Sequence, residues 1–425
     1  MRRGAYLAIV TAAQLLVQML MQLLIVKFVG VGANTDAYLA AQAVPTVVGA
    51  ILIGALQSVW LPRFSLLTKE DNKLRLELGT ANGQSALLGG ALLVFLGTTV
   101  SIWLPILFPG FTPKQHHEAI FYSIFLLCTF AVATQSSILL IALRAQERYF
   151  IGEAVALAAT LVALCMVYVL VPRWGLAAAA WITLGRVVTI YVIQLHLAEW
   201  PPIFVKDGLR DRNSWKLMRP LLLGASIYKT SPVVDRYWGS LADAGAITLL
   251  SLAQLFITAF ATVLERSAVV PLAPRMSRLI DAGRYREARY LYIRFTLSIL
   301  LITVAVVSAA YFGADAIVLV ISRAFSLNAD DSVRLLTLIA ALGGFLFASV
   351  AGAAIVHVFY SMGDTHTPVY IGVIGFSVGL LLKWAFFHSY GVLGLAAATS
   401  TYFVMNILLF LVTLELKISR LEIKR

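Results

Sequence analysis

The chain has 425 residues, of which 60% are hydrophobic and 13% are charged. Soluble domains carry about 25% charged and about 45–50% apolar residues, so this composition excludes a soluble enzyme, a disordered chain and a secreted disulfide scaffold. The net charge of +12 does not call for nucleic acid as a partner, because basic residues also gather at the cytoplasmic edges of membrane proteins. The composition predicts an all-α polytopic membrane protein.

Membrane-crossing helices are predicted wherever about 20 mostly apolar residues follow one another. The seventh of these segments is the least apolar, because it contains Lys229, Pro232, Asp235 and Arg236. The longest loop on the outer side is predicted at about 314–333. The twelve predicted spans are 5–27, 37–61, 84–108, 119–143, 149–171, 175–197, 217–239, 245–271, 291–313, 334–360, 367–388 and 392–416.

The distribution of basic residues predicts the orientation of these spans. With the N-terminus inside, 23 of the 33 Lys and Arg residues fall on the inner side and six fall on the outer side. Because cytoplasmic loops carry the excess of Lys and Arg, both termini are predicted to be cytoplasmic. The predicted location is a bacterial inner membrane.

Two short patterns recur at nearly the same distance along the chain. Residues 62–67 read PRFSLL and residues 274–279 read PRMSRL, an offset of 212. The sixth span opens with GLAAA at 175–179 and the twelfth with GLAAA at 394–398, an offset of 219. Both repeats fall at corresponding places in the order of spans, which indicates an internal duplication.

The duplication predicts two pseudo-symmetric six-helix lobes, at 1–198 and 217–425, joined by a cytoplasmic linker at 199–216. Parallel repeats of this kind are typical of transporters that alternate around a central site. The chain has no GxxxxGK[ST] motif for nucleotide binding. We therefore expect transport driven by an ion gradient, the membrane potential or the substrate gradient, without a cofactor, a metal ion or catalysis.

Two longer motifs resemble those of a known family. Residues 28–38 (FVGVGANTDAY), followed by Pro45, resemble the first outer turn and second helix of MurJ/MviN-type lipid II flippases. Residues 362–368 (MGDTHTP) resemble the turn before that family's eleventh helix, and Gly394-Leu395-Ala396 is similar to the start of its twelfth. The resemblance implies the two-lobed fold of the multidrug/oligosaccharidyl-lipid/polysaccharide (MOP) superfamily, which the multidrug MATE exporters share.

The resemblance also implies a substrate class. The family moves an undecaprenyl-pyrophosphate-linked precursor, and its first two helices carry arginines thought to hold the pyrophosphate. Here the first helix has no cation before Lys27, residues 48–52 are apolar, and twelve spans replace the family's usual fourteen. The predicted substrate is therefore either a lipid II-like precursor or a lipid-linked polysaccharide repeat unit.

Cations inside the spans are the first candidates for substrate binding, because an ionisable group in hydrocarbon usually faces a cavity or a partner. Lys229 and Arg236 are seven residues apart, on one face of the predicted seventh span, with Pro232 expected to kink it. Lys229 is read as a phosphate ligand or as a structural bridge to an acid such as Glu153 or Asp235. The predicted substrate-binding set also includes Arg186, for which a structural bridge is favoured, and Arg266.

A stripe of glutamines marks the first span. Gln14, Gln18 and Gln22 recur every four residues and so share one helix face. Amides facing lipid would lack hydrogen-bond partners, so this face is expected to meet either a polar cavity or a neighbouring helix. The cavity interpretation is favoured, with the amides binding sugar hydroxyls or phosphate.

Four further residues are candidates for gating or coupling. Asp36 is interpreted either as a helix cap or as an outer-gate partner of a cation such as Arg236. Arg63 and Arg275 occupy equivalent repeat positions and are read mainly as topology anchors, with a gate role as the alternative. Glu153 is a candidate for carrying a coupled proton if burial raises its pKa.

Taken together, the sequence predicts a flippase for a lipid-linked anionic saccharide that works by alternating access among membrane lipids. Two alternatives remain open. One is a cation-coupled multidrug exporter of the same superfamily, and the other is a non-transporting scaffold of an envelope-synthesis complex.

Overall fold

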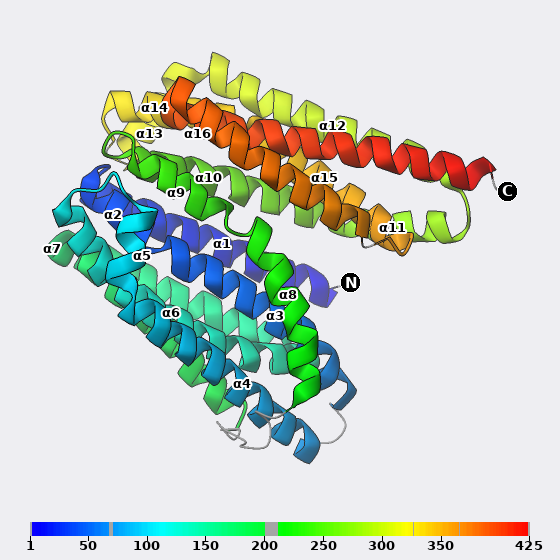
Figure 1. The fold of residues 1–425 in the computed structure, drawn as a ribbon, viewed down its shortest axis with the longest axis horizontal. Helices are drawn as coiled ribbons and strands as arrows, with labels where there is room; N and C mark the ends of the chain where they lie inside the picture. The colour runs from blue at the N-terminus through cyan, green and yellow to red at the C-terminus, as the bar shows by residue number, and fades with distance from the viewer. Residues whose placement is uncertain (1, 68–70, 200–210, 326, 365, 424–425) are drawn as a thin grey trace. The chain divides into compact units, whose positions relative to one another are not determined.

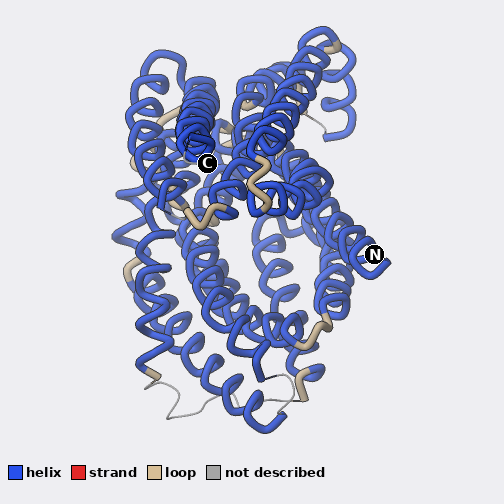
Figure 2. The backbone as a smooth tube through the Cα atoms, turned by 90° about the vertical axis from the view of Figure 1, so that its right-hand side faces the viewer, coloured by secondary structure: helices blue, strands red, loops and turns tan. Residues whose placement is uncertain are grey.

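The structure is a computed structural model that describes residues 2–67, 71–199, 211–325, 327–364 and 366–423. All regular elements in these ranges are helices (Figure 2). The absence of strands follows from the solvent, since a helix satisfies every backbone hydrogen bond within one segment. Contacts divide the chain into two compact units, 1–247 and 248–425.

The N-terminal unit contains nine helices in the described ranges and the start of a tenth. Helices α1, α3, α6 and α7 run alongside one another, with α4 packed on α6 and α8 on α3 (Figure 1). The bounds are α1 Arg2–Val29, α2 Ala33–Ala41, α3 Ala43–Leu67, α4 Asp71–Thr98, α5 Val100–Leu107, α6 Pro113–Ala145, α7 Tyr149–Leu197, α8 Arg212–Tyr228, α9 Ser231–Ser240 and α10 Ala246–Leu264.

The C-terminal unit begins within α10 and is built around α15 and α16. A π-helical turn at Glu265–Val269 follows α10, and α15 packs against α11, α12 and α16. The remaining bounds are α11 Val270–Asp281, α12 Tyr285–Phe312, α13 Ala314–Phe325, α14 Ala329–Ala341, α15 Gly343–Ser361 and α16 His366–Ile423.

Eight helical segments in the described ranges are long and apolar enough to cross a membrane, or nine if the bent pair of α4 and α5 counts as one. Two of these segments, in α7 and α16, each contain two of the predicted spans. The predicted fold class, a multi-helix membrane protein, is confirmed, and the count of twelve spans is consistent with this arrangement. The predicted lobe boundary at 199–216 stays a prediction, and residues 200–210 of it lie outside the described ranges.

A single glycine divides each of the two longest helices into two arms. Gly175 has φ 61° and ψ −146° within α7, and Gly391 has φ 58° and ψ −137° within α16. These dihedral angles are almost restricted to glycine, because a Cβ would collide with the backbone. The second turn lies three residues before Gly394, the glycine that opens the repeated GLAAA motif. The turn in α16 therefore does not fall at the glycine of the repeated motif.

The predicted outer loop at 314–333 is wrong in part. Helix α13 occupies most of it, and α14 begins at Ala329 with Asn328 as its cap. Residues Ala316–Ile321 form a short apolar run that is too brief to predict a span but long enough to form an amphipathic helix.

The MGDTHTP motif ties the start of α16 to its end. The Asp364 carboxylate accepts hydrogen bonds from the backbone N–H groups of His366 and Thr367, at 3.1 and 3.0 Å. Its Oδ2 also accepts from the Lys417 ammonium at 2.6 Å. Burial acts to raise the pKa of Asp364, but the hydrogen bonds from Lys417 and Thr367 outweigh it, so the pKa lies well below its usual range.

Replacing Gly391 by alanine tests the turn in α16. We expect Gly391→Ala to destabilise the protein by about 1–3 kcal/mol, the cost of this positive-φ conformation for a residue with a Cβ. Gly372→Ala, in the same helix, is the matched control, since nothing lies within 4 Å of a Cβ built there. Thermal unfolding of the detergent-solubilised protein measures both, and equal melting temperatures for the two variants would contradict the assignment.

The Asp364–Lys417 pair should make stability depend on pH in the acid range. A carboxyl group whose folded pKa is depressed stabilises the fold above its unfolded pKa, about 3.9, and loses that contribution as the pH falls toward the folded pKa. We therefore expect Asp364→Asn to lower the melting temperature at pH 7 and to narrow its gap to the wild type as the pH falls below about 4. Lys417→Gln should produce the same narrowing, and a pH-independent gap would argue against the pair.

Candidate functional site

A polar cavity lies within the N-terminal unit, between α1, the α2–α3 segment, α6 and α7. Its volume is about 360 Å³, within the usual range of about 300–1,000 Å³ for small-molecule sites. Its polar lining comes from Gln18, Gln22, Tyr38, Gln42, Thr46, Thr129, Thr183 and Arg186. The cavity therefore joins residues from the first three helices with residues of α6 and α7, which lie much later in the sequence.

Two of the three predicted glutamines line this cavity. Gln18 and Gln22 follow one another by one helical turn of α1 and both border the space, whereas Gln14 does not. Of the stripe of glutamines, the two nearer the C-terminal end of α1 therefore line the cavity. Because each amide carries both donors and an acceptor, these side chains suit a ligand rich in hydroxyl groups.

Arg186 is the one charged residue among the described residues that line the cavity. It lies on the second arm of α7, and its Nη1 donates to Thr160 Oγ1 on the first arm at 3.4 Å. Its Nε is buried without a hydrogen-bond partner. No carboxylate in the described ranges forms an ion pair with it, and its electrostatic neighbour is the Tyr38 hydroxyl. Spare donors on a mostly buried guanidinium suit an anionic ligand.

Lys229 lies at the rim of the same cavity. Its Nζ donates to the backbone carbonyl of Ala50 at 2.7 Å, and Ala50 lines the cavity. Gly54, one turn further along α3, borders the ammonium, since a Cβ there would be in ordinary van der Waals contact with Nζ, at 3.4 Å. Within the described part of the chain, Lys229 pairs with no acid.

The predicted seventh span is broken next to Lys229. Helix α8 ends at Tyr228 and α9 begins at Ser231, with Pro232 in its first turn. Proline has no N–H and collides with the preceding turn, which ends a helix rather than bending it gently here. The expectation that Lys229 and Arg236 share one face of a continuous helix is therefore wrong, and half-buried Arg236 lies on α9 next to buried Asp235.

Asp36 is 3% exposed near the start of α2. Its Oδ2 accepts from the backbone N–H of Gly245 at 2.6 Å, across 209 residues of sequence. Gly245 has φ +92°, and a Cβ there would collide with Val31. Asp36 of the FVGVGANTDAY motif thus joins α2 to the turn before α10. The N-cap residue of α2 is Gly32, and it makes no side-chain capping hydrogen bond.

The other predicted gate residues lie apart from the cavity lining. Arg63 Nη1 pairs with Asp211 at 2.6 Å, and Arg144 pairs with Glu153 at 2.9 Å, both within the N-terminal unit. Burial alone would raise the pKa of Asp211, but the hydrogen bond from Arg63 outweighs burial. The pKa of Asp211 therefore lies below its usual value. In the C-terminal unit, Arg266 is exposed on the π-helical turn and Arg275 is exposed on α11.

The structure adds residues that the sequence did not single out. Tyr38 of α2, Gln42 between α2 and α3, and Thr46 of α3 line the cavity. The Tyr38 hydroxyl interacts with Thr183, Gln42 and Arg186. In the C-terminal unit, Lys383 is 2% exposed, with its Nζ 5.8 Å from the Tyr402 ring centre. Tyr38 directly follows Thr35-Asp36-Ala37 in the sequence. This position next to the motif is the feature by which the sequence could have identified it as a site residue.

The Arg63–Asp211 pair should couple the end of α3 to the start of α8. Their side chains are 29% and 22% exposed, so a double-mutant cycle of Arg63→Gln and Asp211→Asn should give a coupling of about 1 kcal/mol. The Arg284–Glu287 pair, with side chains 59% and 54% exposed, is the control and should give at most about 0.5 kcal/mol. Equal couplings for the two pairs, measured by thermal unfolding, would contradict the structural role.

Comparisons with solved structures agree with this fold. A lipid II flippase MurJ in its inward closed conformation superposes with a TM-score of 0.82 at 16% identity, covering 96% of this chain and 87% of that one. An inward-facing multidrug resistance MATE family transporter of the MOP superfamily gives 0.74 at 15% identity, covering 96% and 95%. At these identities the likeness concerns the fold alone.

Sequence comparisons point to one family. A probable lipid II flippase MurJ of Synechocystis sp. is 25% identical over 162 residues, 38% of this chain and 30% of that protein. Another, from Vibrio cholerae serotype O1, is 26% identical over 231 residues, 49% and 42%. The matches thus span less than half the length of these relatives. The profile of the family described as Lipid II flippase MurJ matches residues 25–423. The chain is a multi-pass membrane protein that belongs to the lipid II flippase MurJ family.

Proposed function

We propose that this protein translocates an undecaprenyl-pyrophosphate-linked cell-envelope precursor across the bacterial inner membrane by alternating access, with both termini cytoplasmic. The observation that carries the proposal is the spare hydrogen-bonding capacity of Arg186 in an amide-lined cavity, with Lys229 at its rim. Family membership supports the same substrate class. The headgroup is either a lipid II-like precursor or a polysaccharide repeat unit.

In this proposal the cations and the amides have separate roles. Arg186 binds the pyrophosphate, because a guanidinium forks two N–H groups toward two phosphate oxygens. Lys229 leaves the Ala50 carbonyl to make a second contact as the headgroup passes the rim. Gln18, Gln22 and Gln42 then exchange hydrogen bonds with the sugar hydroxyls that have lost their water.

The membrane potential is the proposed driving force. An inside-negative potential favours outward movement of an anion by about 2.3 kcal/mol per charge per 100 mV. Glu153 is the less suitable coupling group, because protonating it would break its ion pair with Arg144. Catalysis and a metal ion have no part in the proposal.

Charge distinguishes the proposal from a multidrug exporter. The MATE-like fold is compatible with export of cationic drugs, but the described residues that line the cavity include a cation and no carboxylate. A cationic drug would meet Arg186 with repulsion rather than a partner. The cavity therefore favours an anionic substrate.

Substitution of Arg186 tests the transport proposal. In proteoliposomes with an undecaprenyl-pyrophosphate-linked saccharide, Arg186→Gln should slow translocation by about 10- to 100-fold, since a hydrogen bond to a charged group contributes about 1.5–3 kcal/mol. Arg186→Lys should retain part of the rate, and Lys229→Met should cause a smaller loss. The readout is access of a membrane-impermeant glycan-modifying reagent to the labelled saccharide.

Arg173→Gln is the matched control, because Arg173 is an exposed arginine of the same helix that lies outside the cavity lining. It should leave the rate unchanged. A wild-type protein that transports cationic drugs but no lipid-linked saccharide would favour the exporter. A wild-type protein that moves neither class would favour the scaffold.

A further inference from the structure

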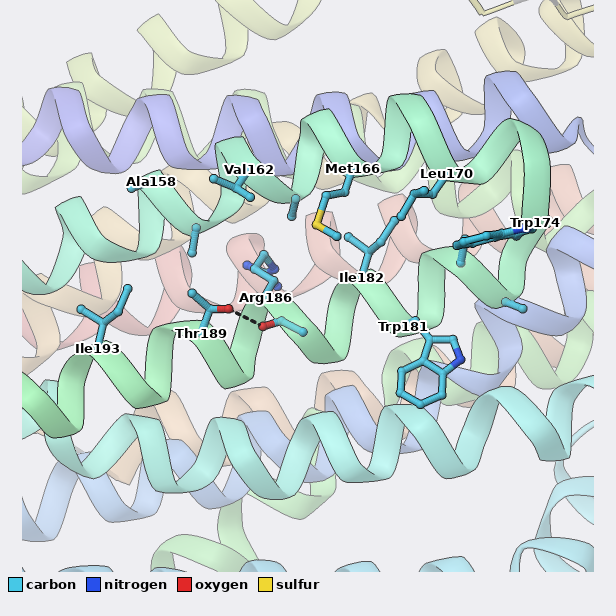
Figure 3. Close-up of a pocket in the computed structure, with 15 residues that line it drawn as sticks. Ala158, Val162, Met166, Leu170, Trp174, Trp181, Ile182, Arg186, Thr189 and Ile193 are labelled. Atoms are coloured by element: carbon cyan, nitrogen blue, oxygen red, sulfur yellow. Dashed lines mark hydrogen bonds between the residues drawn. The ribbon is translucent and has the colours of Figure 1, made fainter.

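A second hollow lies beside the polar cavity, on α7 itself. It is a groove of about 760 Å³ between the two arms of this helix. Val162, Met166 and Leu170 line it from the first arm, and Trp181 and Ile182 from the second (Figure 3). The groove is thus bordered by apolar side chains over most of its length.

Arg186 is the residue that the two hollows share. It is the single charged group among the described residues that line the groove, and it also lines the polar cavity. Figure 3 shows it between the arms, with Trp174 and Trp181 toward one end of the groove and Ile193 toward the other. Its guanidinium therefore lies where the apolar groove meets the polar cavity.

An apolar groove alone does not select a ligand in a membrane, because lipid tails are as apolar as its walls. Selectivity here comes from the arrangement of charge and polarity. A ligand that satisfies both hollows has a phosphate at Arg186, a polar headgroup among the amides and an apolar chain between the arms. Those three parts occur together in a phosphate-linked lipid that carries a sugar.

The length of the groove also suits a long chain. From Ala177 to Ile193 the second arm extends about 24 Å at 1.5 Å per residue, most of the roughly 30 Å hydrocarbon thickness of a bilayer. Arg186 lies near the middle of that length. A chain whose phosphate is at Arg186 therefore has about 10–14 Å of groove on either side.

We propose that the groove between the arms of α7 holds the polyprenyl chain of the substrate while its phosphate is at Arg186. This inference rests on the proposed function and adds the site for the lipid part. The proposal also accounts for Gly185. This exposed glycine lines the groove next to Arg186 and has no side chain to occupy it. Translocation then guides the tail along the protein instead of leaving it in bulk lipid.

Photo-crosslinking of the full-length protein in nanodiscs tests the groove directly. The probe is undecaprenyl pyrophosphate with a diazirine in its chain, and adducts are located by peptide mass spectrometry. We expect adducts within 158–193 that unlabelled probe competes away. Phosphatidylglycerol with a diazirine in its acyl chain is the comparison lipid. Equal labelling of 158–193 by both probes, or adducts confined to other helices, would overturn the proposal.

A groove-filling variant provides the matched pair. Gly185→Leu places a side chain where nothing lies within 4 Å of a Cβ, so the protein should fold while the groove adducts are lost. Gly97→Leu, at an equally open glycine of α4 outside the groove, should keep them. Unchanged adducts in Gly185→Leu would also overturn the assignment.

The flippase assay keeps the two proposals apart. Groove adducts in a protein that fails to translocate the saccharide would support the chain-binding site and contradict the proposed function. Translocation at the normal rate by Gly185→Leu would contradict the chain-binding site and leave the proposed function intact.

Discussion

The site depends on how a single guanidinium is accommodated in a membrane helix. A charged side chain is costly in hydrocarbon, and Arg186 meets that cost through Thr160 on the opposite arm of α7 and the neighbouring Tyr38 hydroxyl. Neither contact is a carboxylate, so the positive charge is shielded but not neutralised. The two hollows that border Arg186 therefore share a positive point at which an anion can be stabilised.

Interruptions of helices produce the geometry around that charge. Gly175 turns α7 back on itself, which places Thr160 on one arm opposite Arg186 on the other. The break after Tyr228 frees Lys229 from helix geometry and lets its ammonium reach the Ala50 carbonyl. At the second break the irregular backbone lies beside polar groups, which is where a membrane protein tolerates it.

The family relationship and the cavity place different limits on the function. The profile match extends over residues 25–423, while the curated relatives are matched over less than half their length. No arginine of α1 lines the cavity, and Gln18 and Gln22 border it instead. Arg186 on α7 provides the cation in this cavity, so the positive charge comes from a different helix.

The sequence by itself determined the fold class, because the membrane requires long apolar runs and continuous backbone hydrogen bonding, and both are visible residue by residue. It also predicted an irregularity near Pro232, expected as a kink and found as a break just before α9, and the amide face of α1, which follows from a spacing of four. It could not determine which glycine turns α16, or that Asp36 binds the backbone of Gly245. The second depends on a contact between segments that lie 209 residues apart.

The role of Arg186 was likewise decided only by tertiary structure. From the sequence, a structural bridge was favoured, because the fold that the chain resembles lines its central cavity mainly with the first, second, seventh and eighth helices. The structure surrounds it instead with Thr160, Tyr38 and two hollows, from helices that the sequence does not pair with one another. Local patterns specify what each helix can bury, but the free hydrogen-bonding capacity of a side chain depends on which neighbours the folded chain brings to it.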